Sequence, residues 1–123
     1  MPESILFDAP DLAARVERLS PSEIDRLSFG VIRIDREGTV LLYSQTEARQ
    51  SGLNKIPKGE NLYEVSSCFA SDDFRGRITR ALEKGPVDLE FGWKGDFADP
   101  TRDLRFRIQS SDTKGLWVFV ERD

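Results

Sequence analysis

The sequence predicts a single α+β domain: a five-stranded antiparallel sheet flanked by helices, with a helical cap at the N-terminus. The first observation is length, because 123 residues suffice for one compact domain but not for two with separate cores. The second is the order of the patterned segments: two strands, several short helices, one longer helix and three strands. The third is composition, since 38% hydrophobic and 33% charged residues are typical of a folded domain rather than a disordered one.

Two short helices are expected before the first strand. Leu12, Val16 and Leu19 recur at helical spacing, which indicates an amphipathic helix with one apolar face. A second helix is expected to begin at Ser20, because a proline follows it and Glu23 stands at the spacing of a capping box. Both helices are expected to form a cap outside the main fold.

The chain is expected to divide into a cap and a core that together make one domain. Residues 1–27 form the cap, and residues 28–123 form the core. The core begins with a hairpin, because Phe29–Asp35 and Thr39–Tyr43 are rich in β-branched and aromatic residues. Between them Gly38 supplies a turn residue that tolerates positive φ.

One longer helix and three strands complete the core. The helix is expected to begin after Ser71 and to end at Lys84, because a glycine and a proline follow. Its arginines, Arg75, Arg77 and Arg80, are expected to face water. The last strand is apolar on both faces, and the one before it alternates apolar with polar residues. The three strands are expected at Val87–Trp93, Leu104–Gln109 and Leu116–Val120.

Composition excludes several classes of function. The chain has no histidine, which removes Ser-His-Asp and Cys-His catalysis, His-ligated haem and almost every ordinary zinc site, so no metal is expected. A formal net charge of -4 gives the chain no excess of positive charge for binding nucleic acid, so no nucleic-acid partner is expected. No apolar run approaches a membrane span and no export signal is visible, so a cytoplasmic location without membrane contact is expected. With one cysteine, Cys68, an internal disulfide is impossible.

Three stretches of the chain and one spacing resemble a known family. The spacing places a glutamate four residues after Tyr43 and the lone cysteine about twenty residues later. The stretches are Leu27–Gly30, Asp35–Gly38 and Trp117–Arg122. Together they are similar to the photoactive yellow proteins, small blue-light receptors built on the PAS fold.

This resemblance implies a chromophore and the residues that hold it. Cys68 would carry a 4-hydroxycinnamoyl (p-coumaroyl) group as a thioester, and its buried phenolate would accept hydrogen bonds from Tyr43 and from a protonated Glu47. Such donors are needed because a phenol ordinarily titrates near 10, and burial alone pushes that pKa higher. Ser51 matches the family's usual threonine and would orient the tyrosine hydroxyl.

The chain also departs from the family pattern. The family's lid arginine over the phenolate corresponds to Leu53 here. Arg49 is near enough in sequence to replace that cation, or is an ordinary solvated charge. Phe97 is the candidate for the family's pocket phenylalanine.

The implied function is that of a blue-light photoreceptor and not of an enzyme. Isomerisation of the chromophore, proton transfer from Glu47 and partial unfolding with release of the cap would signal to an unidentified downstream protein; a homodimer is compatible with the sequence. The alternative is a chromophore-free PAS-type ligand-binding or dimerisation module. A cysteine-dependent hydrolase is a poor third reading, because the thiol has no evident base.

Overall fold

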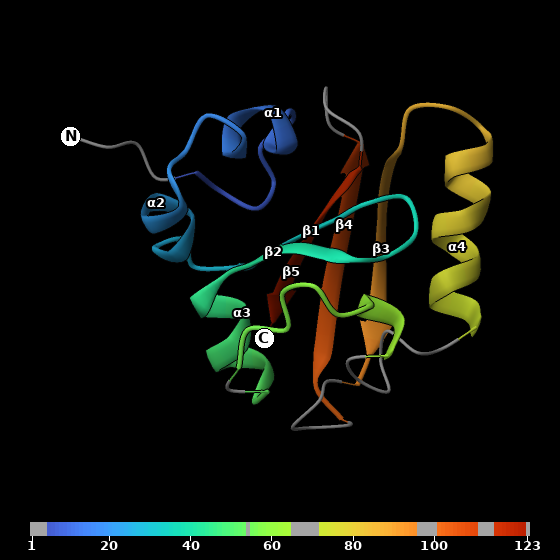
Figure 1. The fold of residues 1–123 in the computed structure, drawn as a ribbon. Helices are drawn as coiled ribbons and strands as arrows, with labels where there is room; N and C mark the ends of the chain where they lie inside the picture. Colours follow the sequence, from blue (N-terminus) through green and yellow to red (C-terminus); the bar gives the residue numbers. More distant parts are fainter. Residues whose placement is uncertain (1–4, 54, 65–71, 96–100, 111–114, 123) are drawn as a thin grey trace.

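A computed structural model describes residues 5–53, 55–64, 72–95, 101–110 and 115–122. Its centre is one five-stranded sheet with the strand order β2-β1-β5-β4-β3, and every neighbouring pair is antiparallel (Figure 1). The expected α+β architecture is therefore confirmed. Among the described residues, no helix combines the length and apolar composition that crossing a membrane requires.

The five expected strands are all present, with ends that shift by one or two residues. Gly38, in the turn of the first hairpin, has a φ of 95°, as the turn prediction requires. The strands are β1 (Gly30–Ile34), β2 (Val40–Tyr43), β3 (Asp88–Lys94), β4 (Asp103–Ser110) and β5 (Leu116–Arg122).

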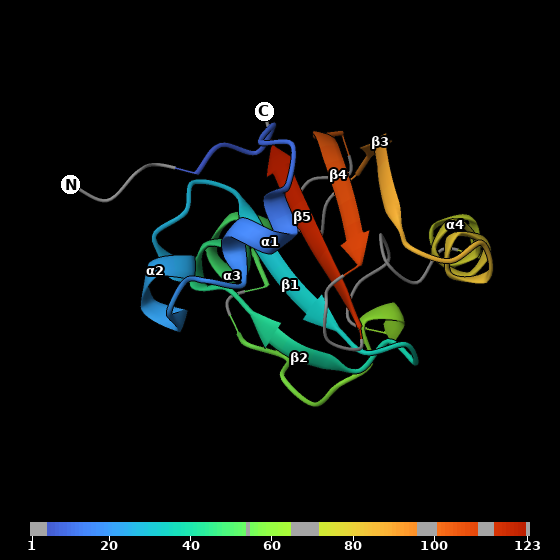
Figure 2. The same cartoon turned by 90° about the horizontal axis from the view of Figure 1, so that it is seen from above.

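The helices lie in two groups on either side of the sheet. The N-terminal pair sits apart from the long helix in both ribbon views (Figures 1 and 2). The N-terminal group, residues 5–27, contains α1 (Leu12–Val16) and α2 (Pro21–Asp25). The second group is α3 (Gln45–Ser51), the 3₁₀ turn η1 (Leu62–Glu64) and α4 (Asp72–Glu83).

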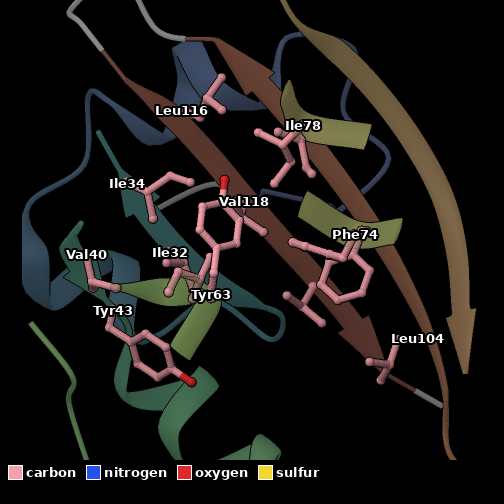
Figure 3. Close-up of a cluster of buried hydrophobic side chains, with 14 of the residues drawn as sticks. Ile32, Ile34, Val40, Tyr43, Tyr63, Phe74, Ile78, Leu104, Leu116 and Val118 are labelled. Carbon is pink, nitrogen blue, oxygen red and sulfur yellow. The ribbon is translucent and has the colours of Figure 1, made fainter. Parts of the chain in front are cut away.

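Each face of the sheet carries its own hydrophobic cluster. The larger cluster lies under α3, η1 and α4 and includes Tyr43, Tyr63 and Phe74 (Figure 3). The smaller one joins α1 and α2 to β1 and β5. Strand β5 lies between them: Val118 belongs to the larger cluster and Phe119 to the smaller, which explains why its sequence is apolar on both faces.

The α4 arginines correct one expectation. Arg77 is half-buried, and its guanidinium lies 4.8 Å from the centre of the Phe91 ring. Arg75 is exposed but stacks on Tyr63 at 5.0 Å. Only Arg80 of the three is exposed without such a ring contact in the described part of the chain. The reason is that a guanidinium is attracted to the face of an aromatic ring, so Arg75 and Arg77 lie against neighbouring rings rather than extending into water.

The N-terminal group is anchored by polar side chains of β4. Arg107 is 7% exposed, and its Nη1 donates to the carbonyl oxygens of Phe7 at 2.6 Å and Ala9 at 2.7 Å. Gln109, also 7% exposed, accepts a hydrogen bond from the backbone N–H of Ala13 at 2.8 Å. Residues 5–27 thus contribute buried contacts to the sheet, and the division of the chain into a cap, residues 1–27, and a core, residues 28–123, stays a prediction.

The capping box at α2 yields a stability prediction. Ser20 Oγ accepts from the Glu23 N–H at 3.3 Å, and Glu23 Oε1 accepts from the Ser20 N–H at 3.0 Å, as the sequence predicts. Ser20→Ala is expected to lower the free energy of unfolding by about 1 kcal/mol, measured by urea denaturation. Ser28→Ala is the control at another exposed serine; equal effects of the two substitutions would contradict the capping role.

Candidate functional site

Helix α3 is held firmly at the end of β2. Ser44 caps it: its Oγ accepts from the N–H of Glu47 at 3.1 Å and from the N–H of Val31 at 3.1 Å. Thr46 Oγ1 lies 2.9 Å from the carbonyl oxygens of both Asp25 and Leu27, which share its one hydroxyl proton. At the other end, Gly52 adopts a φ of 86° and stops the helix. The seven-residue helix is thereby fixed at both ends, and its buried side chains face the sheet.

Three of the predicted site residues are buried on this β2–α3 segment. Tyr43 is 6% exposed and lies beside α3 in the core (Figure 3). Glu47 is fully buried, and Ser51, one helical turn later, is 3% exposed. Ser51 Oγ accepts from the N–H of Leu53 at 3.2 Å. Glu47 and Ser51 therefore share one face of α3, and that face turns inward.

The Glu47 carboxyl group is paired with Arg122, which the sequence did not reveal. Arg122 Nη1 donates to Oε1 and Nη2 to Oε2, both at 2.7 Å, and the Arg122 side chain is 5% exposed. Two parallel charge-assisted bonds of this kind are the strong form of the arginine–carboxylate contact. Because both carboxyl oxygens accept, this arrangement differs from the expected protonated Glu47 that donates.

A periodicity signal for Arg122 was present in the sequence. Side chains two apart on a strand share a face, and Val118 and Val120 both belong to the cluster beneath α3. Arg122 continues that series at the end of β5, and so points to the side that α3 covers.

Gly30 completes this buried site from β1. A Cβ placed there would overlap Glu47 Oε1 and lie 2.9 Å from Glu47 Cδ, closer than side chains normally approach. Gly30 pairs with Val120 in the register of β1 and β5. Glycine at this position therefore makes room for the acid between the sheet and α3.

The remaining predicted residues are not drawn into the same buried group. Arg49 is exposed and lines a shallow surface groove of about 290 Å³ with Lys55 and neighbouring α3 residues. Leu53 is half-buried and packs against the larger cluster. Cys68 and Phe97 lie outside the residues that the structure describes.

A second arginine that the sequence analysis did not single out contacts α3. Arg102, which is half-buried, donates from Nη1 to the carbonyl oxygen of Gln50 at 2.9 Å. A cation at the carboxyl end of a helix also interacts favourably with the helix dipole. Arg102 therefore binds the carboxyl end of α3, whereas Arg122 binds the buried Glu47 carboxyl group.

A second buried phenol lies in the same cluster as Tyr43. Tyr63 is 9% exposed on η1, and burial raises its pKa, an effect that the nearby Arg75 charge opposes. Burial therefore favours the neutral form of the Tyr63 phenol.

Comparison with known proteins reveals full-length relatives. The chain is 26% identical over 125 residues to the photoactive yellow protein of Rhodothalassium salexigens, covering 98% of each, and 28% identical over 119 residues to that of Halochromatium salexigens, covering 94% of this chain and 95% of the relative. No family model matches.

Solved structures give the same fold. The photoactive yellow protein domain of the sensor histidine kinase Ppr from Rhodospirillum centenum superposes with a TM-score of 0.73 at 28% identity, over 87% of this chain and 96% of that one. The PAS domain of the Cronobacter turicensis quorum-sensing receptor RpfR, in complex with C12:0, reaches 0.62 at 19% identity, over 79% and 95%, and speaks for the fold alone.

Proposed function

We propose that this chain, a PAS-fold protein, is a light receptor with a p-coumaroyl (4-hydroxycinnamoyl) thioester on Cys68. The chain resembles the photoactive yellow proteins over nearly its whole length. The observation that carries the proposal is the buried polar group at the end of β2, where Tyr43 and Glu47 lie inside the core. Burying an acid and a phenol on one short segment is costly in a core that serves packing alone.

The side chains present fit an anionic phenol. A buried phenolate needs hydrogen-bond donors and a compensating positive charge. Tyr43 offers a hydroxyl, and the guanidinium of Arg122 brings a cation to the same buried region. Ser51 lines the same inner face of α3. When bound, the chromophore supplies blue-light absorption and a double bond that isomerises.

The proposed receptor performs no turnover and transmits a change of shape. Light-driven rearrangement at α3 reaches the sheet, because Glu47 contacts β1 at Gly30 and β5 at Arg122. The opposite face of β5 holds the N-terminal group through Phe119. We therefore place the output in a loosening of residues 1–27, read by a downstream signalling protein or by a second copy of the chain.

Reconstitution tests the attachment. Purified chromophore-free protein mixed with an activated 4-hydroxycinnamic acid is expected to gain a visible absorption band and the mass of one thioester-linked group. Cys68→Ala should abolish both, while the neighbouring Ser67→Ala should retain both. Folded wild-type protein that gains neither band nor mass would contradict the photoreceptor.

If the folded protein gains neither band nor mass, the second candidate function remains, a chromophore-free PAS-type ligand-binding or dimerisation module. One observation favours this second candidate: both carboxyl oxygens of Glu47 are already engaged by Arg122, so the acid is neutralised within the chain itself. A site whose charges already balance in this way needs no anionic ligand.

A further inference from the structure

The Glu47–Arg122 pair lies at the meeting point of α3, β1 and β5. Glu47 is fully buried, and the Arg122 side chain is 5% exposed. An ion pair withdrawn from water so completely carries a large desolvation cost, which close bidentate contact offsets only in part. A purely structural contact is therefore a poor explanation for an ion pair buried in the proposed site.

Of the basic side chains in the described part of the chain, Arg122 is the one that pairs with the buried acid of α3. The lid position of the family holds Leu53, which brings no charge. Arg49 is exposed on the outer side of α3, and Arg102 is bound to the carbonyl oxygen of Gln50. By contrast, Arg122 reaches the Glu47 carboxyl directly from β5.

The charges facing Glu47 can be followed element by element. Among the described residues, α3 itself carries the exposed Arg49; β1 contributes Gly30, which has no charge; β2 ends in Tyr43; and β5 contributes Arg122. The pair is neutral as a unit. Adding a phenolate while Glu47 stays ionised would place a second, uncompensated anion in the core.

We infer that Arg122 is the fixed counter-ion of this pocket, that it holds Glu47 as a carboxylate in the chromophore-free protein, and that Glu47 accepts the phenol's proton when the chromophore is loaded. The inference about loading rests on the proposed function. One proton moves from the phenol oxygen to a carboxyl oxygen of Glu47, and no other bond changes in this step. Before and after it, one negative charge faces Arg122, so the charge of the core is unchanged.

This assignment gives Arg122 a role that differs from the family pattern. The positive charge comes from the last residue of β5 rather than from the segment after α3. Arg122 thereby couples the protonation of Glu47 to the strand that also packs against the N-terminal group.

Infrared spectroscopy of the chromophore-free protein tests the resting state. Comparison of wild type with Glu47→Gln should reveal a carboxylate band for Glu47 near neutral pH and no carbonyl stretch of a protonated acid. Arg122→Met should produce the protonated-acid band, because the buried acid has lost its counter-ion. Arg122→Lys keeps the charge and should keep the carboxylate band of Glu47. It is the variant to measure if Arg122→Met fails to fold. Arg49→Met, the control on α3, should leave the spectrum unchanged.

A protonated-acid band for Glu47 in chromophore-free wild type, or a carboxylate that persists in folded Arg122→Met, would overturn the counter-ion role. In loaded protein, the protonated-acid band of Glu47 should appear, and Arg122→Met should move visible absorption to the shorter wavelength of a neutral phenol. Unchanged absorption in that variant also contradicts the inference. If no chromophore attaches but the resting-state spectra are as expected, the proposed function and the loading step fail while the counter-ion role stands.

Discussion

Gly30→Ala is expected to lower the free energy of unfolding by about 3 kcal/mol, a value between the cost of overpacking a core and that of breaking a buried ion pair. The added methyl group would overlap Glu47 Oε1 and crowd Glu47 Cδ. The carboxyl group has no exposed surface to retreat to, and moving it separates it from Arg122. Chemical denaturation of the chromophore-free protein measures the loss.

Two comparisons isolate the cause of that loss. Gly92→Ala, on β3, is the matched control, because a Cβ there would meet nothing closer than 3.9 Å. In a Glu47→Ala background the carboxyl group is gone, so Gly30→Ala should cost far less than in wild type. Equal costs in the two backgrounds would contradict the steric contact.

The fold could be predicted from local patterns because each element carries its own signal. Strand β5 showed an apolar residue at every position from Leu116 to Val120, which requires cover on both faces, and both faces are covered. The α2 capping box and the glycine of the first turn were equally local. Such features depend on a few neighbouring residues and not on how distant segments meet.

The candidate site could be predicted only in part, because its partners meet through tertiary packing. The resemblance pointed to Glu47, and α3 does bury it. Arg122 entered the sequence analysis only as the end of the stretch Trp117–Arg122, and its partner is 75 residues away in sequence. Arg107 likewise occupied a polar position of an alternating strand. The period of a strand indicates the face on which each arginine lies, but the partner depends on which distant element covers that face, and the period does not encode that.

Arg107→Ala is expected to release the N-terminal group from the sheet. The substitution removes the donor for the Phe7 and Ala9 carbonyl oxygens, at a site where the arginine is 7% exposed. Hydrogen bonds to a charged group contribute about 1.5 to 3 kcal/mol each, so a loss of about 3 kcal/mol is expected. Hydrogen exchange should show faster exchange across residues 5–27, while β1, β4 and β5 keep most of their protection.

Arg105→Ala is the matched control, since Arg105 lies on the same strand and also reaches the N-terminal group. Its guanidinium contacts Asp8 at 2.8 Å, Glu90 at 2.6 Å and Glu121 at 3.0 Å, yet its side chain is 45% exposed. Exposed ion pairs contribute little, so this variant should exchange almost like wild type. If instead Arg105→Ala loosens the segment as much as Arg107→Ala does, surface charge and not buried hydrogen bonding holds it. Salt would then weaken the attachment, and the proposed output of the receptor would depend on ionic strength rather than on what happens inside the sheet.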